Sequence, residues 1–546
     1  MEIYTLSSRN RKRITLQRPH LWTLFVFFKI SSQELRFRAC YIIDFWSKIW
    51  YDIGNCRRAQ TQGKITLKKR AKILLILGIL ILTLALAVIG IARSGRFKNG
   101  CYFKYETNAD NETCTVIKCI PLGKKEISVP EMIGRYRVSE IGAYAFANRT
   151  RLTAVSLPEG IETIGIGAFY ECKSLQKIDI PNSITSIGSY AFYNCAELTN
   201  VVLPADILDV GTRVFEGCGK ITEATVPVVA IQTLPAENIT SLTVNGGNHI
   251  EHGTFKNFKN LKSITLSPYI EKVDVGAFIG CSNITSATAP ADLISYIPKG
   301  KLTHIVINGG TQIAPKALQN CGFLTSITLP SSITEIGDLA FADCFRLVEI
   351  YNLSPLQITK GALDNGGIGR YALNIYSTAD VLSKTWETDD GYLFYEDGEI
   401  CYLLGYIGND TALTLPRDCN GKEYIIRESA FYLDSHITTI TFSEGILQIE
   451  NYAFAHCKGL TEIILPDSLV SIGEYAFCEC EGLEEVSFGK DLKAIGAYAF
   501  DECNRLTQVL FRGTTEEWKA VALGNDWITY TPADEVLCTN GSVTLK

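Results

Sequence analysis

LTEIILPDSLVSIGEYAFCEC, residues 460–480, is the stretch of sequence that decides the fold. Its first half alternates apolar and polar residues, which predicts a short strand with one inward apolar face. The inward residues of this strand are Leu460, Ile463 and Leu465. Pro466 ends the strand, because proline cannot donate a hydrogen bond to a neighbouring strand. One such strand cannot bury its apolar face alone, so similar units are expected on either side of it.

A bend and an Ala-Phe pair make up the rest of the stretch. Gly473, which follows Ile472, permits a tight bend. Ala476 is small enough for a close approach of two backbones, and Phe477 fills the interior of the turn. The unit is therefore LxxIxLPxxIxxIGxxAFxxCxx, and each copy of it predicts one coil of the chain.

The Ala-Phe pair, or a close equivalent, recurs at fixed intervals through the chain. Most neighbouring copies are separated by the length of one unit, and two longer gaps each equal one full coil and one shortened coil. The copies are Ala145-Phe146, Ala168-Phe169, Ala191-Phe192, Val214-Phe215, Thr254-Phe255, Ala277-Phe278, Ala317-Leu318, Ala340-Phe341, Ala430-Phe431, Ala453-Phe454, Ala476-Phe477 and Ala499-Phe500. A period of this length indicates a solenoid of stacked units.

Blocks such as LTSITLPSSITEIGDLAFADC (324–344) and residues 460–480 resemble the BspA-like leucine-rich-repeat family, a group of surface and secreted proteins. The resemblance covers about residues 130–511. It implies a β-rich leucine-rich-repeat solenoid with 23-residue repeats, wound as a curved right-handed coil. It also implies adhesion or ligand binding at cells or matrix, although a fold alone does not fix a function.

Composition and periodicity divide the chain into seven expected parts. In chain order these are 1–72 (basic segment), 73–92 (transmembrane helix or signal anchor), 99–129 (N-terminal cap), 130–351 (repeats), 352–427 (hairpin-like insertion), 428–511 (repeats) and 512–546 (C-terminal cap). Alternating aromatic and polar residues around Glu396-Asp397-Gly398-Glu399 predict a β-hairpin in the insertion. Its aromatic side chains form either a packing plug or a carbohydrate platform.

The segment 73–92 is an apolar run without a single charge. A helix of this length spans the roughly 30 Å hydrocarbon core of a bilayer. The segment 1–72 before it is rich in Lys and Arg, so the positive-inside rule predicts a cytoplasmic N-terminus and an extracellular body. Two alternatives stay open: a signal peptide cleaved near Ala85-Leu86-Ala87, which would give a secreted protein, and translation that starts at Leu67.

The body of the chain is acidic. The segment 1–98 holds 19 of the 52 Lys and Arg and 4 of the 58 Asp and Glu, which leaves a net charge of -21 from position 99 onward. Phosphate backbones require a basic surface, so no nucleic acid partner is expected. The expected partners are the membrane, through a single span, and an extracellular protein or glycan.

A cysteine stands three positions after the phenylalanine in most coils. The predicted structural ladder consists of Phe169, Cys172, Phe192, Cys195, Phe278, Cys281, Phe341, Cys344, Phe454, Cys457, Phe477, Cys480, Phe500 and Cys503. Small apolar thiols in a fixed interior slot are expected to be buried and unreactive. A linear ladder does not converge on a tetrahedron, so neither a metal site nor a cofactor is expected.

No pattern in the sequence indicates catalysis. Nucleophile elbows, Walker loops and dinucleotide fingerprints are missing, and His249-Ile-Glu-His252 lacks the spacing of a zinc-binding helix. Asp389-Asp390 lies in a predicted loop, where solvation explains a pair of acids. Two carboxylates can also serve a glycosidase, so an enzyme of that class stays an alternative. The sequence predicts a protein that is not an enzyme.

The third and fifth positions of LxxIxL alternate with the inward residues and are expected to point to solvent. The candidate ligand face is Lys177, Asp179, Ser263, Thr265, Ser286, Thr288, Ser326, Thr328, Glu349, Tyr351, Thr439, Thr441 and Glu462. Strand propensity alone explains Ser and Thr at such places. Repeat proteins also present extended surfaces to partners, and this one suits a polar or basic partner. The predicted function is adhesion or recognition at the cell surface, and the alternatives are an envelope spacer and a carbohydrate-active enzyme.

Overall fold

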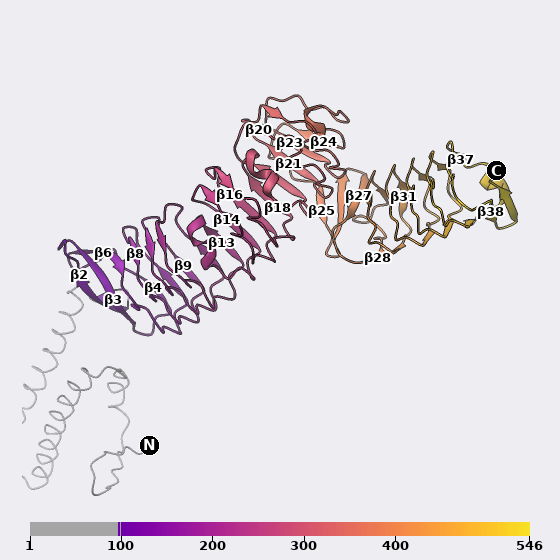
Figure 1. Cartoon of the computed structure of the whole chain (residues 1–546). Helices are drawn as coiled ribbons and strands as arrows, with labels where there is room; N and C mark the ends of the chain where they lie inside the picture. The colour runs from indigo at the N-terminus through magenta and orange to yellow at the C-terminus, as the bar shows by residue number, and fades with distance from the viewer. Residues whose placement is uncertain (1–96, 99, 546) are drawn as a thin grey trace, which may run out of the picture. The chain divides into compact units, whose positions relative to one another are not determined.

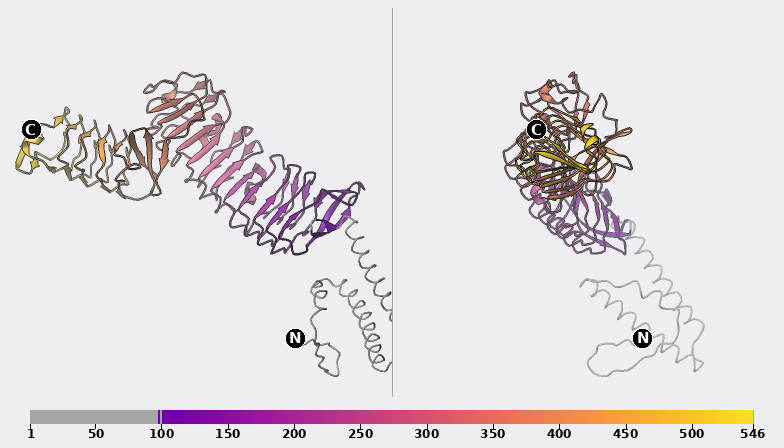
Figure 2. Two further views of the ribbon diagram at one scale, coloured as in Figure 1. Left: turned by 180° about the vertical axis from the view of Figure 1, so that it is seen from behind. Right: turned by 90° about the vertical axis from the view of Figure 1, so that its right-hand side faces the viewer.

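The computed structural model describes residues 97–98 and 100–545 (Figure 1). They form a β-solenoid of leucine-rich-repeat coils that follow one another in chain order (Figures 1 and 2). The predicted β-rich solenoid is therefore confirmed. Within this part of the chain no helix has the length and apolar character needed to cross a bilayer. The segment 73–92 lies outside the described residues.

Each coil begins with a short strand, here called its first strand, and parallel pairing joins most neighbouring first strands into four sheets. In chain order they are β4 (Glu126–Ser128), β7 (Ala154–Ser156), β9 (Lys177–Asp179), β11 (Asn200–Val202), β13 (Glu223–Val226), β14 (Ser241–Val244), β16 (Ser263–Leu266), β18 (Ser286–Ala289), β19 (His304–Ile307), β21 (Ser326–Leu329), β23 (Glu349–Asn352), β24 (Asn374–Tyr376), β28 (Ala412–Thr414), β30 (Thr439–Thr441), β32 (Glu462–Ile464), β34 (Glu485–Phe488), β36 (Gln508–Phe511) and β38 (Glu535–Cys538). We call β4–β24 the first run and β28–β38 the second run.

Most coils also contain a second strand, which the repeat pattern indicated only as a bend. These strands pair in parallel in separate sheets. They are β6 (Tyr136–Ile141), β8 (Thr163–Ile164), β10 (Ser186–Ile187), β12 (Asp209–Val210), β15 (His249–Ile250), β17 (Lys272–Val273), β20 (Gln312–Ile313), β22 (Glu335–Ile336), β29 (Tyr424–Ile426), β31 (Ile446–Ile449), β33 (Ser471–Ile472), β35 (Ala494–Ile495) and β37 (Ala522–Leu523). Short 3-10 helices stand in three other coils: η2 (Val228–Thr233), η3 (Ala291–Tyr296) and η4 (Asn365–Gly367).

The two longer gaps between Ala-Phe pairs each contain one shortened coil. Glu223 pairs with Ser241 and Ser286 pairs with His304, so η2 and η3 each complete a coil that is shorter than the regular unit. The same offset appears in the hydrogen bonds from Thr240 to the carbonyl of Thr222 and from Thr303 to that of Thr285. The short helix thus replaces the second strand and the Ala-Phe turn.

The glycine of the repeat is required by close packing rather than by backbone conformation. A Cβ atom on Gly473 would lie 2.6 Å from the backbone nitrogen of Asn451 in the preceding coil. The left-handed conformations belong instead to Tyr475 and Glu479, both with φ of 54°. These two residues turn the chain so that Phe477 N–H can donate to the carbonyl of Ala499 in the next coil, at 2.8 Å.

The structure places every residue of the predicted Phe-Cys ladder in the core. Phe454, Phe477 and Phe500 stack with ring centroids 5.1 Å apart. The Cys480 thiol donates to the carbonyl of Phe454, at 3.3 Å, and the same contact recurs at most ladder cysteines. Burial raises the pKa of the thiols of Cys172, Cys281, Cys457, Cys480 and Cys503, to about 12 for Cys503. They are therefore protonated near neutral pH.

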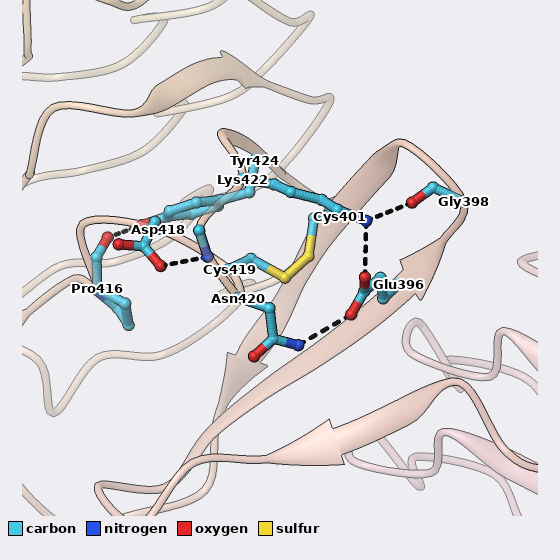
Figure 3. Close-up of a disulfide and its surroundings, with 10 residues drawn as sticks. Glu396, Gly398, Cys401, Pro416, Asp418, Cys419, Asn420, Lys422 and Tyr424 are labelled. Carbon is cyan, nitrogen blue, oxygen red and sulfur yellow. Dashed lines mark hydrogen bonds and ion pairs between the residues drawn. A yellow bond between two sulfur atoms is a disulfide. The ribbon is translucent and has the colours of Figure 1, made fainter.

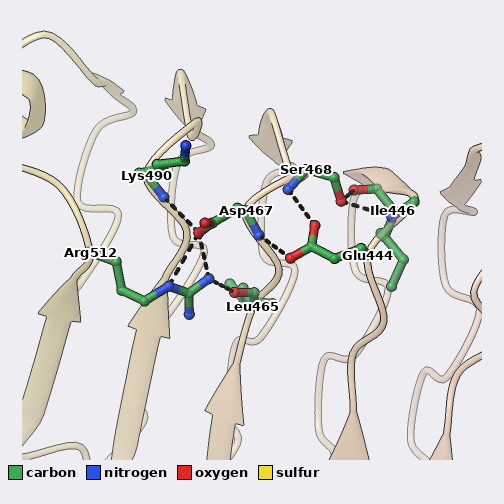
Figure 4. A network of polar contacts seen from close by, with 8 residues as sticks. Glu444, Ile446, Leu465, Asp467, Ser468, Lys490 and Arg512 are labelled. Atoms are coloured by element: carbon green, nitrogen blue, oxygen red, sulfur yellow. Dashed lines mark hydrogen bonds and ion pairs between the residues drawn. The ribbon is translucent and has the colours of Figure 1, made fainter.

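Carboxylates on the proline turn bond the coils to one another (Figure 4). Glu444 accepts from the backbone N–H groups of Asp467 and Ser468, at 3.1 and 3.0 Å. Asp467 in turn accepts from the backbone of Lys490 and from the guanidinium of Arg512, the latter at 2.7 Å. Each acid thus satisfies donors of a later coil, so part of the acidic character of the body serves the fold.

Both runs begin with an antiparallel hairpin. In the first, β2 (Cys101–Thr107) pairs with β3 (Thr113–Pro121), and β3 then pairs in parallel with β6. In the second, β26 (Tyr392–Asp397) pairs with β27 (Ile400–Tyr406), and β27 then pairs in parallel with β29. A short edge strand adds to each hairpin, β1 (Phe97–Lys98) to β2 and β25 (Thr385–Glu387) to β26. We call these the two cap hairpins; β5 (Met132–Ile133) pairs with β6 beside the first.

The second run ends in a small cap. α3 (Thr515–Lys519) starts at Thr514, whose hydroxyl accepts from the backbone of Glu517 in a capping box. Trp518 and Trp527 are buried against the last coils, and β39 (Gly541–Thr544) closes the sheet antiparallel to β38. These elements cover the apolar end of the stack.

A disulfide joins the second cap hairpin to the first coil of the second run (Figure 3). Cys401 in β27 is bonded to Cys419, which lies in the loop before β29. Lys422 holds the same loop through the carboxylate of Glu396 and the carbonyl of Gly398, at 2.7 and 2.6 Å. The repeat pattern assigned a role to neither cysteine.

Candidate ligand-binding face

Two rows of hydroxyl side chains run along the first strands of the first run. Parallel register aligns Ser241, Ser263 and Ser286 in one row. The second row consists of Thr225, Thr243, Thr265 and Thr288. All of these side chains are half-buried, while the residues between them, such as Ile264, are fully buried. Neighbours in a row are about 4.7–4.9 Å apart, the spacing of paired strands.

The expected exposure is wrong for three members of the candidate face. Ser326, Glu349 and Tyr351 have exposed fractions of only 6%, 0% and 7%. The repeat pattern did not reveal this because the covering chain, β24 and the residues up to β25, lies outside the regular repeat. Thr328, between them, stays half-buried.

The covering segment makes specific contacts with the sheet. The Glu349 carboxylate accepts from the backbone N–H of Lys384, at 2.9 Å, and from the Ser383 hydroxyl. The ring of Tyr376 packs against that of Tyr351, with centroids 5.1 Å apart, and burial raises the pKa of Tyr351 to about 12. These residues close one end of the hydroxyl rows and are not available to a ligand.

His304 interrupts the serine row and was not among the predicted face residues. It pairs with Ser286 on one side and Ser326 on the other. One ring nitrogen lies 2.7 Å from the Thr303 hydroxyl, and burial lowers the pKa of the imidazole. The strand register assigns His304 to the serine row, because His304 precedes the buried Ile305 as serine precedes a buried isoleucine in other coils. The sequence pattern missed this assignment because His304 follows a shortened coil.

The remaining candidate residues lie at the far ends of the sheet series. Lys177 and Asp179 are exposed in β9, where they form an ion pair at 3.1 Å. Thr439, Thr441 and Glu462 are exposed in the second run, on β30 and β32. The structure therefore does not gather the predicted face into one compact site. It leaves the hydroxyl rows of β13–β18 as the open central part.

A cleft lies between the coils of the first run and the loop that joins β25 to β26; we call it the junction cleft. It has a volume of about 540 Å³. The coils contribute Lys262, Lys301 and Glu237 to its lining, the end of β25 contributes Glu387, and the loop contributes Asp389 and Asp390. The repeat pattern could not place lysines beside Asp389-Asp390, because the two segments are far apart in the sequence.

No cluster of metal-binding side chains is present in the part of the chain that the structure describes. His249, weighed above as a metal ligand, instead contacts the carboxylate of Asp274 at 3.0 Å. Lys272 contacts the same carboxylate at 2.9 Å, and hydrogen bonds from Lys272 and His249 lower the pKa of Asp274 to about 2. His252 contacts the carbonyl of Val275.

Comparison with solved structures finds bacterial repeat proteins. A leucine-rich cell surface protein from Faecalibacterium prausnitzii is 22% identical over 78% of this chain and 97% of its own, with a TM-score of 0.24. The pneumococcal vaccine antigen PcpA is 15% identical over 81% and 97%, with a TM-score of 0.20. A leucine-rich-repeat protein of T. pallidum is 24% identical over 33% and 87%, with a TM-score of 0.27. No curated protein sequence matches the chain significantly.

The sequence model of one family matches most of the coils. It is described as the BspA type leucine rich repeat region, and it matches residues 125–238, 232–348, 298–366 and 424–532. These ranges together span more than half of the chain and leave out both cap hairpins. The resemblance that the repeat sequence indicated is thereby confirmed, and the chain belongs to the BspA-type leucine-rich-repeat family.

Proposed function

We propose that this protein is a recognition protein that binds a polar partner outside the cell through the hydroxyl rows of β13–β18. One observation carries the proposal: the rows keep strict register over several coils and stay open to solvent. Hydroxyl groups both donate and accept hydrogen bonds, so such rows suit a glycan or a polar protein surface. Membership of a family of surface repeat proteins supports the same function.

The rows contain few large side chains that could anchor a partner. Binding hot spots are usually aromatic residues or arginine in desolvated pockets, and the open rows consist of serine and threonine. Each contact is therefore weak, and the proposed binding depends on many contacts along the solenoid or on many copies of the protein at the cell surface.

We further propose that residues 73–92 anchor the protein in the cell membrane with the solenoid outside. The apolar run and its basic flank support this topology. The Cys401–Cys419 disulfide also supports it, because disulfides persist in oxidising compartments. Protease treatment of intact cells, followed by extraction of membranes at high pH, tests the anchor. Release of the solenoid without its N-terminal segment is expected, and a protected solenoid would contradict the topology.

Binding to an array of matrix proteins, mucins and glycans tests the recognition function. The variant carries Ser263→Lys, Thr265→Lys, Ser286→Lys and Thr288→Lys, which place long charged side chains on the rows. The matched control carries Leu208→Lys and Val275→Lys, at positions off the face that are 80% and 82% exposed. We expect saturable binding that the row variant loses and the control retains. Binding that survives in both variants would move the site elsewhere.

An enzyme acting on carbohydrate is the second candidate, because carboxylates line the junction cleft. A glycosidase needs one carboxyl group whose pKa is raised by an apolar surrounding. Glu387, Asp389 and Asp390 are instead exposed to solvent, which favours binding over turnover. Incubation of the protein with every glycan that it binds, followed by analysis for shortened products, decides between the two. A spacer without a ligand would bind nothing on the array.

A further inference from the structure

The junction cleft has charges of both signs that the protein leaves unpaired. Lys262, Lys301 and Glu237 come from the coils, Glu387 ends β25, and Asp389 and Asp390 come from the β25–β26 loop. None of these side chains takes part in an ion pair within the described residues, although ion pairs are common elsewhere on the solenoid. Unpaired charges that line a cleft are free to meet opposite charges on a partner.

The cap hairpin does not itself require the acids. The two cap hairpins have the same pairing, with an edge strand antiparallel to the first hairpin strand. In the first, Lys98 at the end of β1 pairs with Cys101 at the start of β2, and no acidic residue stands between them in the sequence. In the second, the sequence between the strands is Thr388-Asp389-Asp390-Gly391. Acidic residues between the two strands are thus not a requirement of this pairing. The acidic residues of the second turn need another explanation, and their position beside the cleft supplies one.

The coils give the cleft an elongated lining. Thr222, Thr240, Lys262 and Thr285 each come directly before a first strand, in successive coils. The hydroxyls of Thr240 and Thr285 donate to the carbonyls of the preceding coil, at 3.2 and 3.3 Å. Their oxygen atoms remain able to accept. The cleft therefore combines a row of acceptors with two basic and four acidic side chains, the fourth acid being Glu237 from the coils.

We infer that the junction cleft binds an extended polypeptide segment that carries both basic and acidic side chains. Basic side chains of the segment would meet Asp389 and Asp390, acidic ones would meet Lys262 and Lys301, and backbone N–H groups would donate to the threonine oxygens. Four coil spacings, from Thr222 to Lys301, cover about 19 Å, which matches about six residues of extended chain.

A protein segment fits the cleft better than a glycan. Sugar rings are commonly held against aromatic faces, and the residues that line the junction cleft include no aromatic side chain. Alternating charges of both signs at short intervals are an ordinary property of a polypeptide. A smaller cavity of about 350 Å³ shares Lys301, Ile407 and Gly408 with the cleft and adds Phe323, which can take an apolar residue at one end of the segment.

Fluorescent octapeptides titrated against the full chain test the inference by fluorescence anisotropy. Four peptides are compared: alternating lysine and glutamate separated by serine, lysine with serine, glutamate with serine, and serine with glycine. We expect the mixed peptide to bind most tightly, with an affinity that falls as salt is added. A lysine-only peptide that binds as tightly as the mixed one would overturn the inference, because it would show simple attraction to an acidic body.

Charge-removing variants then locate the binding. Asp389→Asn with Asp390→Asn should weaken binding of the mixed peptide by about tenfold. The variant should then bind the mixed peptide only as tightly as the unaltered protein binds the glutamate-only peptide. The Lys262→Gln with Lys301→Gln variant should bind the mixed peptide only as tightly as the unaltered protein binds the lysine-only peptide. The control, Lys256→Gln with Asp292→Asn, changes exposed residues outside the cleft and should have no effect. Equal affinities in cleft and control variants would overturn the inference.

Two further results keep this site distinct from the hydroxyl rows. A neutral row variant, Thr265→Val with Thr288→Val, adds no charge near the cleft and should bind the mixed peptide as the unaltered protein does, so loss of one site does not imply loss of the other. A glycan from the array whose binding is abolished by Asp389→Asn and Asp390→Asn, and not by the row variant, would instead identify the cleft as a glycan site.

Discussion

At the scale of single residues, the ladder cysteine combines two roles. Its side chain is fully buried in the core that contains the stacked phenylalanines, and its thiol donates to a carbonyl of the preceding coil. Spacing alone predicted the first role, because the cysteine keeps a fixed distance from the phenylalanine in coil after coil. The hydrogen bond could not be predicted, since it depends on how two neighbouring coils are stacked.

Replacement of Cys480 tests this combination. Cys480→Ala removes both the volume and the donor, and we expect it to reduce the free energy of unfolding by about 1–3 kcal/mol. Cys480→Ser restores a donor and should recover part of that loss. Cys478 is the matched control, because it lies close by in the same turn and is only half-buried. The measurement is the thermal midpoint by circular dichroism, and a smaller effect for Cys480→Ala than for Cys478→Ala would contradict the role.

The same burial governs chemical reactivity. A thiol reacts as the thiolate, and the raised pKa of the ladder cysteines keeps the thiolate scarce. Iodoacetamide treatment of the native protein should therefore leave Cys172 and Cys457 unmodified in peptide mass spectra, whereas both should react after denaturation. Rapid modification of either one in the native protein would show that its coil opens.

At the scale of elements, the insertion 352–427 does not follow the repeat, yet it packs against the cores of both runs. The insertion 352–427 contains a hairpin whose large apolar side chains pack on both faces. Phe394 and Tyr406 belong to the core of the second run, and Leu393 and Tyr395 pack with Val348 of the first. This packing favours the plug over the carbohydrate platform. The alternation of residues around Glu396–Glu399 predicted the hairpin, but no sequence pattern indicated its partners.

The Cys401–Cys419 disulfide lies within the same insertion. Its two cysteines are 18 positions apart in the sequence, and a constraint of that length on the unfolded chain is worth about 3 kcal/mol in the chain-entropy model. We expect Cys401→Ser with Cys419→Ser to lower the thermal midpoint of the second run. The ion pair of Lys422 with Glu396 should still hold the loop at low salt.

Reduction of the unaltered protein provides the control for that variant. Mild reductant should lower the midpoint by the same amount as the double substitution and should have no further effect on the substituted protein. A midpoint that is unchanged in both would mean that the loop is held by its other contacts alone.

At the scale of the whole molecule, the repeat made the architecture predictable and the interruptions limited the prediction of the site. Ser263, Thr265, Ser286 and Thr288 lie on the open sheet because their strands keep the inward and outward alternation of the repeat. Glu349 and Tyr351 obey the same pattern yet are buried, since a segment without periodicity covers them. Long-range coverage depends on tertiary packing, which a local pattern does not encode.

The described solenoid has two large cores. One extends from Cys101 to Ala372 and the other from Tyr392 to Val536, and each begins with a cap hairpin. Arg346 joins them: its guanidinium donates to the carbonyls of Gly322, Leu404 and Ala430. A second hairpin that starts a second core suggests that the second run is stable by itself.

Expression of residues 384–546 alone tests this. The fragment keeps the cap hairpin, the disulfide, all coils of the second run and the C-terminal cap with Trp518 and Trp527, so its core stays covered at both ends. We expect a β-rich circular dichroism spectrum and a cooperative melt.

The matched fragment 428–546 lacks the hairpin and exposes Phe431, which is fully buried in the chain, so it should aggregate or stay unfolded. Removal of the first run uncovers Leu393 and Tyr395, and self-association of the longer fragment through that face is expected at high concentration. If both fragments were equally unfolded, the second run would depend on the first, and the hairpin would serve as a connector between the runs rather than as the start of an independent one.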